Sequence, residues 1–442
     1  MKDPVEGEKA FSGGFSVTLV ADQLRRRVPG GIGVYALGLM QGFAEACASF
    51  PEEEKDRGIC ADLRFNLLAS KKKPDPDPLG DFMASWGAEG NNGDALFRLS
   101  EKTPNSRAFM AACRFGLLSL PKSDLLAATS LVVPKHGGTV SVAVHDLAFR
   151  DVPESFTAHG RKWHEAALKK ALERADGFSV PTVQMAHRVR EMTDKPAAVI
   201  GYGCDHLPEP DFDGAQIILR TIFGKEQESG HKLLLAVGTL EPRKNLERIA
   251  KAFSAAKTSY DGKVSLLVIG PRGWGPQSGV AGDGVYLLGA VSPGELAAFY
   301  GMAYALIYIP ILEGYGLPVA EAFYAGVPVV SSDVPSAGGA TLLADPLNEA
   351  DMAEKILMLL RDSRLRDGLI AKGQERLSGQ RWRDIALQHL LFWRYLQARR
   401  VNGKEWENIL GKSGIHPESR ENNNLRLSYE GKDLSYGLEM FV

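Results

Sequence analysis

The stretch from residue 305 to 331 constrains the fold of this chain more than any other. An apolar run over 305–309 predicts a buried strand, and Gly-Tyr-Gly over 314–316 predicts a flexible turn. Pro318 suits the first position of a helix, and Gly326 suits the place where that helix ends. A second apolar run follows. Strand, helix and strand in this order indicate two parallel strands joined by a crossover helix.

The same alternation continues through the C-terminal half. Strands that alternate with helices indicate a parallel sheet covered by helices on both faces. The predicted strands of that half are 233–237, 264–269, 285–288, 305–309 and 327–331. The N-terminal half carries predicted strands at 15–21, 65–69, 140–144, 177–180 and 199–200, and predicted helices at 30–48 and 158–175. The sequence therefore predicts an α/β protein.

With 442 residues the chain is long enough for two domains of about 200 residues each. Residues 71–92 are rich in charge, proline and glycine, which predicts a long surface loop. One added strand is expected near the C-terminus, at 422–429. We predict an N-terminal domain over 1–207, a linker over 208–230, a C-terminal domain over 231–395 and a polar tail over 396–442.

Composition narrows the functional classes. The 52 Lys and Arg residues nearly balance the 54 Asp and Glu residues, so no bulk charge favours nucleic acid. The four cysteines have no pair spacing, which argues against a disulfide framework or a zinc site and favours a reducing cytoplasm. The charged start, residues 1–9, lacks the apolar core of a signal peptide, and no apolar run predicts a membrane span.

Two carboxylates flank the glycine turn. Glu313 precedes it and Glu321 lies inside the following helix, with seven residues between them. Backbone amides of a glycine-rich turn at a helix N-terminus form an anion site that suits phosphate. Because carboxylates repel phosphate, these two are expected to accept hydrogen bonds from hydroxyl groups. Phosphate and hydroxyl groups together indicate a nucleotide sugar; solvated acids on an ordinary strand-turn-helix are the alternative.

The stretch 233–245 joins a predicted strand to a basic loop. The apolar run ends at Gly238, and Arg243 and Lys244 stand just before a helix that Asn245 is expected to cap. Arginine offers a fork of donors and lysine a point charge, and the pair suits a diphosphate. A basic loop that only faces water is the alternative.

Several polar or glycine-rich stretches come directly after predicted strands. Ligands of open parallel sheets bind beyond the carboxyl ends of the strands, so we expect these stretches to form a common rim facing a cleft between two domains. For the histidine among them, the alternative is a side chain satisfied within the core. The stretches are His145, 239–244, Gly270, Gly289 and 313–317.

These blocks resemble those of a known enzyme family. Glu313 and Glu321 match the Glu-x7-Glu signature of family-4 retaining glycosyltransferases, embedded here in Glu-Gly-Tyr-Gly-Leu-Pro. Residues 238–245 resemble the family's Gly-x-Leu-x-Pro-x-Lys-Asn pattern, and 145–147 resemble its His-Asp-Leu element. The resemblance spans roughly 15–392. It implies the GT-B fold, in which two Rossmann-like domains face a central cleft.

The resemblance implies four catalytic residues. His145 reaches the donor sugar, and Glu313 holds the sugar hydroxyls. Arg243 and Lys244 stabilise the departing diphosphate, which helps to deprotonate the acceptor in a front-face displacement.

Other residues are implied to bind the donor. The Gly-Gly-Ile-Gly loop at 30–33 faces the donor phosphates and the acceptor, although helix packing alone would also explain Gly33. Asp146 orients the histidine or begins the next turn, and Glu321 holds the ribose. The full donor-binding set is Gly31, Gly33, Asp146, Gly270, Val291, Gly314, Tyr315, Gly316, Leu317 and Glu321.

The chain departs from the family's pattern at three places. Thr239 replaces the common arginine at the strand end, so either Arg243 takes over its role or Lys244 alone reaches phosphate. Gly-Cys-Asp stands at 203–205, where Asn-Gly-Val-Asp is usual. Residues 334–339 lack a Leu-Pro-Glu element, which predicts a local deletion with donor binding intact.

The resemblance implies a retaining hexosyltransferase, in the style of bacterial mannosyltransferases of polysaccharide or lipid-linked glycan assembly. We predict a GDP-mannose donor ahead of a UDP-sugar, a glycan or polyprenyl-linked acceptor, no cofactor and no metal, because no Asp-x-Asp carrier sits on the rim. The basic helix at 158–175 either faces solvent or contacts the inner membrane face peripherally. A nucleotide-sugar 2-epimerase and a non-catalytic nucleotide-sugar binding subunit stay open as alternatives.

Overall fold

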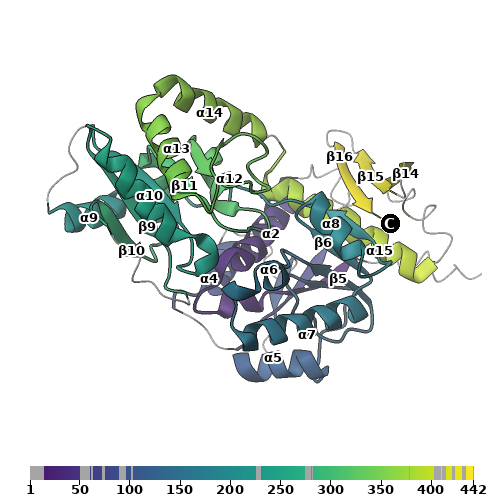
Figure 1. Ribbon diagram of the computed structural model, residues 1–442. Helices are drawn as coiled ribbons and strands as arrows, with labels where there is room; N and C mark the ends of the chain where they lie inside the picture. The colour runs from purple at the N-terminus through teal and green to yellow at the C-terminus, as the bar shows by residue number, and fades with distance from the viewer. Residues whose placement is uncertain are drawn as a thin grey trace, which may run out of the picture. The chain divides into compact units, whose positions relative to one another are not determined.

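A computed structural model shows two compact units (Figure 1). Unit 1 comprises Met1–Asp146, Ala158–Gly203 and Arg381–Val442, and unit 2 comprises Leu147–Thr157 and Cys204–Gln380. The start of the chain (1–9), parts of the predicted loop (72–74 and 89–92), of the predicted linker (225–229) and of the predicted tail (403–409 and 411–414) lie outside the described residues. The structure describes residues 14–49, 60, 63–71, 75–88, 96–100, 103–224, 230–273, 280, 282–377, 379–402, 410, 415–420, 424–430 and 435–441.

Unit 2 is built on a parallel six-stranded sheet, as the alternation of apolar runs predicted. Its strand order is β10-β9-β8-β11-β12-β13, and every neighbouring pair is parallel. The strands are β8 (Lys232–Val237), β9 (Val264–Ile269), β10 (Val285–Gly289), β11 (Ala305–Tyr308), β12 (Val329–Ser331) and β13 (Leu342–Leu343).

Helices cover both faces of this sheet. Because successive side chains of a strand point to opposite faces, Leu234 and Ala236 of β8 join one core while Leu233 and Leu235 join the other. The first core contains α10 (Leu246–Thr258), α13 (Glu349–Arg361) and α14 (Ser363–Arg376). The second contains α9 (Phe212–Phe223), α11 (Pro293–Met302) and α12 (Leu317–Tyr324). Shorter elements of the unit are α6 (Ala148–Asp151), η2 (Pro153–Ser155) and η3 (Pro242–Lys244).

The stretch 208–230, assigned from sequence to a linker, contains α9. Asp211 caps this helix by accepting a hydrogen bond from the backbone of Gly214, and Ala215 and Leu219 are fully buried in the second core. The acidic, proline-rich start of the stretch indicated a linker. The apolar residues after it make the helix part of unit 2 instead.

Unit 1 contains a ten-stranded sheet in the order β14-β15-β16-β7-β6-β5-β4-β1-β2-β3. The pairs from β7 to β3 are parallel. These strands are β1 (Ser16–Val20), β2 (Arg64–Leu68), β3 (Phe97–Leu99), β4 (Leu125–Ala128), β5 (Thr139–Ala143), β6 (Gly177–Val180) and β7 (Ala197–Val199). They confirm the strands predicted in the N-terminal half, whereas β3 and β4 were not anticipated.

Three antiparallel strands from the end of the chain extend this sheet (yellow in Figure 1). β15 (Asn424–Glu430) confirms the added strand expected at 422–429, and β14 (Ile415–Arg420) and β16 (Ser435–Phe441) flank it. β16 pairs antiparallel with β7, with Met440 opposite Ala198. The polar composition of this region conceals the alternation that buries Leu425 and Leu427.

Unit 1 contains a helix inside a stretch that the sequence predicted as a loop. Residues 78–88 of the predicted loop 71–92 form this helix, and its Leu79 and Phe82 are buried. Pro78 is compatible with the helix because proline is tolerated in the first helical turn. The helices are α2 (Gly30–Ser49), α4 (Pro78–Ala88), α5 (Ser106–Phe115), α7 (Ala158–Arg174), α8 (Val183–Arg190) and α15 (Trp382–Asn402), with a 3-10 turn η1 (Asp22–Arg25).

Helix α15 packs against α2, and its first residue sets the close approach. The indole of Trp382 is 2% exposed, and a Cβ atom at Gly38, Gly42 or Gly203 would collide with Trp382. Gly38 and Gly203 therefore make room for the indole ring, and Gly42 makes room for the backbone of Trp382. No helix in the described part of the chain is long and apolar enough to cross a membrane.

Candidate active site

Three glycines mark the carboxyl ends of neighbouring strands in unit 2. The backbone N–H of Gly238 donates to Ile269 (2.9 Å), and that of Gly270 donates to Gly289 (2.8 Å). A Cβ atom on Gly270 would collide with the carbonyl oxygen of Gly238. The ends of β8, β9 and β10 therefore lie together, and Gly270 is required there for close backbone packing.

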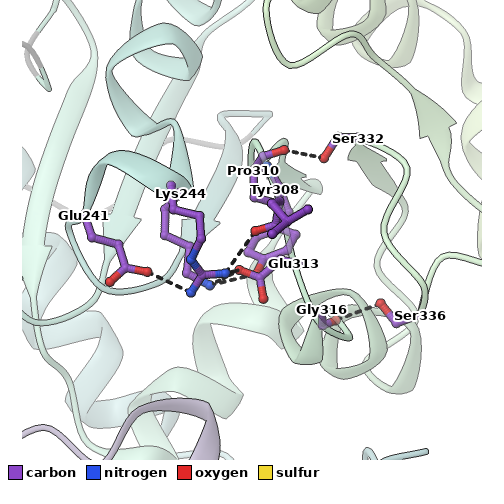
Figure 2. A network of polar contacts seen from close by, with 10 residues as sticks. Glu241, Lys244, Tyr308, Pro310, Glu313, Gly316, Ser332 and Ser336 are labelled. Carbon is purple, nitrogen blue, oxygen red and sulfur yellow. Dashed lines mark hydrogen bonds and ion pairs between the residues drawn. The ribbon is translucent and has the colours of Figure 1, made fainter. Parts of the chain in front are cut away.

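The turn between β11 and α12 is supported by the loop after β12. Gly316 has φ 96°, a left-handed conformation that favours glycine, and caps the N-terminus of α12. The Ser336 hydroxyl donates to the Gly316 carbonyl (2.8 Å), and the Ser336 backbone N–H donates to the Tyr315 carbonyl (2.9 Å). Figure 2 shows the hydrogen bond of the Ser336 hydroxyl and a second one, from the Ser332 hydroxyl to the Pro310 carbonyl (2.7 Å). Serines thus hold the turn in the region that lacks the family's Leu-Pro-Glu element.

Two cations and two carboxylates form a compact cluster beside this turn (Figure 2). Arg243 Nη1 and Lys244 Nζ both donate to Oε1 of Glu313, the former at 2.6 Å. Arg243 Nη2 donates to Oε1 of Glu241 (2.9 Å), and Lys244 Nζ donates to the Tyr308 hydroxyl (3.0 Å). The basic loop of 239–244 and the acid before the glycine turn therefore meet directly.

Burial and the neighbouring cations shift the pKa values of the two acids in opposite directions. Burial alone would raise the pKa of Glu313, but attraction to Lys244 and Arg243 outweighs it and holds the pKa below its usual range. The pKa of Glu241 is raised, because burial outweighs the attraction of Arg243 and Lys244. Glu313 is thus the firmly ionised partner of the cations, and an anion that binds them competes with its carboxylate.

Asn245 does not cap α10 with its side chain, so that expectation is wrong. It has φ 61°, and its side-chain amide donates to the backbone oxygens of Ile309 (3.0 Å) and Pro346 (2.7 Å). Asparagine tolerates this left-handed conformation. The residue therefore ties the basic loop to the end of the β11 segment, which keeps Lys244 beside Glu313.

Glu321 lies on α12 in a second polar cluster that the sequence did not reveal. Its Oε1 accepts a hydrogen bond from the His206 ring (3.1 Å) and its Oε2 accepts one from the Tyr300 hydroxyl (2.8 Å). His206 directly follows the unusual Gly-Cys-Asp at 203–205, and no spacing pattern connects it with Glu321. The two clusters thus contain four residues that the sequence did not single out, Glu241, Tyr308, His206 and Tyr300.

The remaining predicted residues of unit 2 also follow its strand ends. Tyr315 is buried, and its hydroxyl donates to Oε1 of Gln380 (3.1 Å). Val291 follows β10 and packs partly buried against the second core. Gly314 lies between Glu313 and Tyr315 in the turn, and Leu317 begins α12.

His145, Asp146, Gly31 and Gly33 lie in unit 1. Nε2 of His145 donates to the backbone oxygen of Thr129 (2.7 Å), so its Nδ1 accepts from the Tyr202 hydroxyl. Burial lowers the pKa of His145, which favours the neutral ring. Gly31 and Gly33 belong to the first turn of α2, and a Cβ atom on Gly33 would collide with Pro29.

Comparison with known proteins relates part of the chain to a known family. The profile of a family described as "Glycosyl transferases group 1" matches residues 220–376. The chain is 25% identical over 268 residues to O-antigen chain mannosyltransferase B of Escherichia coli, covering 57% of this chain and 69% of that protein. Residues 220–376 therefore carry the group 1 glycosyl transferase domain. The transferase is thus an enzyme of a retaining hexosyltransferase family.

Further relatives agree with this assignment. The transferase is 27% identical over 201 residues to O-antigen chain mannosyltransferase RfbU of Salmonella typhimurium, covering 44% of this chain and 52% of that one. Among solved structures, sucrose-phosphate synthase from Thermosynechococcus elongatus gives a TM-score of 0.60 at 19% identity, covering 87% of this chain and 99% of that chain. WaaG, a glycosyltransferase involved in lipopolysaccharide biosynthesis, gives 0.56 at 15% identity, covering 88% and 100%. These likenesses confirm the predicted α/β fold with two Rossmann-like domains of the GT-B type.

Proposed function

We propose that the transferase moves mannose, with retention, from GDP-mannose to a lipid-linked glycan of the O-antigen type. The contact that carries this proposal is the shared acceptor Oε1 of Glu313, on which Arg243 and Lys244 converge beside the glycine turn. The mannose and the acceptor are inferred from the names of the similar proteins, which are O-antigen mannosyltransferases.

The cluster suits the chemistry of a departing diphosphate. As the sugar–phosphate bond breaks, negative charge grows on the leaving oxygen, and fixed cations stabilise that charge more than they stabilise the bound donor. Arg243 and Lys244 supply two such cations, and Arg243 thereby takes the role of the arginine that Thr239 replaces. Glu313, once released from the cations, accepts hydrogen bonds from the sugar hydroxyls.

We assign the rest of the donor to the surrounding residues. The backbone of Gly314 to Leu317, at the start of α12, binds phosphate, Glu321 binds the ribose, and the loops at Gly270 and Val291 bind the base. From unit 1, we propose that the Gly31–Gly33 turn approaches the phosphates. His145 reaches the sugar if a sugar hydroxyl replaces Tyr202 on Nδ1.

We propose that the enzyme works in the cytoplasm, with peripheral contact at the inner membrane face through unit 1. Lys170 Nζ donates to the Arg114 carbonyl (2.8 Å) and ties α7 to the end of α5, where Phe115 and Leu117 are 68% and 77% exposed. Apolar side chains next to exposed cations suit an anionic bilayer. Flotation with phosphatidylglycerol vesicles should fall for Phe115→Ser and Leu117→Ser; undiminished flotation would contradict the contact.

A donor panel followed by a product assay tests the function. GDP-mannose, other GDP-sugars, UDP-sugars and ADP-sugars are compared by thermal shift, because a ligand at 100 times its Kd stabilises the folded state by about 2.7 kcal/mol. We expect the largest shift with GDP-mannose, and mannosyl transfer only when the glycan acceptor is added. Conversion of the donor without acceptor would indicate an epimerase, and binding without turnover would indicate a binding subunit.

A further inference from the structure

The carboxylate of Glu321 is held from two sides by donors from separate parts of unit 2. His206, two residues after the start of the 204–380 segment, donates from Nε2 to Oε1 (3.1 Å). Tyr300, on α11, donates its hydroxyl to Oε2 (2.8 Å). The side chains of His206 and Glu321 are each 6% exposed, and Tyr300 is fully buried. Bulk water therefore competes little for these bonds.

This arrangement fixes the plane of the carboxylate as well as its position, because each oxygen has its own donor. An ionised carboxylate accepts about four hydrogen bonds, so two acceptor directions remain after His206 and Tyr300 are satisfied. Two remaining directions in a fixed plane match the two vicinal hydroxyls of a ribose. A carboxylate free to rotate would bind either hydroxyl or water with less discrimination.

We infer that His206 is a positioning residue that makes Glu321 selective for ribonucleoside diphosphates over their deoxy counterparts. The inference rests on the proposed role of Glu321 at the ribose. It assigns a task to the residue that directly follows Gly-Cys-Asp at 203–205, where the family usually has Asn-Gly-Val-Asp.

If His206 has only a structural role, a different result is expected. The buried pair would then only anchor the segment that begins at Cys204, and its loss would lower stability without changing the preference for ribose. The preference for ribose is therefore the quantity to measure.

Calorimetric titration with GDP and with 2′,3′-dideoxy-GDP measures that preference as a ratio of affinities. Hydrogen bonds to a carboxylate are strong, so we expect the wild type to bind the dideoxy form at least tenfold more weakly. In His206→Leu the ratio should fall to about threefold or less. In His206→Gln it should stay near the wild-type value, because the glutamine amide can reach the place of Nε2, whereas the shorter His206→Asn should behave like His206→Leu.

His231 offers a matched control, since its Nε2 bonds to the Ser265 hydroxyl (3.0 Å) elsewhere in unit 2; His231→Leu should leave the ratio unchanged. If His206→Leu does not fold, the comparison of His206→Gln with His206→Asn decides. An unchanged ratio in both His206→Leu and His206→Asn, with the ratio lost in Glu321→Gln, overturns the inference and leaves the ribose role of Glu321 standing. A wild type that does not distinguish the two nucleotides overturns the ribose role as well.

Discussion

Lys244 and Glu313, which lie 69 residues apart in the sequence, form an ion pair between Nζ and Oε1. Their side chains are 13% and 11% exposed, so solvent screens the pair weakly. A phosphate that binds Lys244 must share or replace this carboxylate. The strength of donor binding is therefore a difference between two electrostatic attractions, and substitutions at Lys244 and at Glu313 separate them.

Replacing Lys244 by alanine should weaken the binding of nucleotide sugars. A charged hydrogen bond contributes roughly 1.5–3 kcal/mol, which is on the order of 10- to 150-fold in Kd. Calorimetric titration with GDP and UDP ligands measures the effect. Lys251→Ala is the control, because Lys251 is 52% exposed and pairs with Glu247 on α10. Equal affinities for wild type and Lys244→Ala would refute the phosphate assignment.

Glu313→Gln should raise the affinity for GDP and lower the kcat with the full donor. Without its charge, the competitor for Arg243 and Lys244 weakens, so the affinity for GDP should rise by about three- to tenfold. The kcat with the full donor should fall more than the donor affinity, because the carboxylate steadies positive charge growing on the sugar ring in the transition state. Glu321→Gln should instead raise mainly the KM for the donor. Steady-state kinetics and titration check both; equal, small effects of the two substitutions would remove these carboxylates from the mechanism.

Transfer should survive excess EDTA. The cations Arg243 and Lys244 provide the positive charge that a divalent metal would otherwise supply to the diphosphate. Initial rates are measured after incubation with EDTA and again after addition of manganese or magnesium. Activity lost with EDTA and restored by metal would show that these side chains do not suffice.

Stability should depend on pH through His389 in unit 1. Its Nδ1 donates to the Ile385 carbonyl (2.8 Å), and its Nε2 accepts from the Tyr35 hydroxyl (2.7 Å). Burial lowers the pKa of His389 from its ordinary value of 6.5 to about 4. Below pH 6.5, His389 therefore binds a proton in the unfolded chain but stays neutral in the folded chain. The free energy of unfolding falls as pH drops toward 4.

The expected loss from this group is about 2 kcal/mol between pH 7 and pH 5. Urea unfolding followed by tryptophan fluorescence measures it, since Trp393 packs against the His389 ring (5.7 Å between ring centroids). His389→Gln should flatten the pH dependence by that amount, while the exposed His159→Gln should not change it. An identical slope in wild type and His389→Gln would mean that another group titrates.

The sheets were predictable where burial leaves a local trace. β9 over Val264–Ile269 and β6 over Gly177–Val180 match their predicted bounds, because a continuous apolar run marks a strand buried on both faces. Helix α9 and strands β14 to β16 were missed or only partly predicted. Their burial depends on partners far away in the sequence, such as the pairing of Met440 with Ala198.

The contacts of the candidate site were likewise predictable only in part. The contact of Arg243 and Lys244 with Glu313 follows from strand ends on one rim, which the sequence shows. Glu241 stood two residues before Arg243 in the same block and could have been named with it. His206 carried no signal, because its partner Glu321 is reached only through the folding of the intervening chain.

The pairing of β16 with β7 has a consequence for how the protein is made. Unit 2 takes most of its chain from the single run Cys204–Gln380, so a ribosome releases nearly all of it in one piece. The sheet of unit 1 cannot be completed until residues near Met440 have left the ribosome. Until then the outer edge of β7 presents unpaired backbone groups to other nascent chains. The middle of this polypeptide can therefore finish folding before its beginning does. A truncation that removes β16 would leave the edge of β7 unpaired and prone to aggregation.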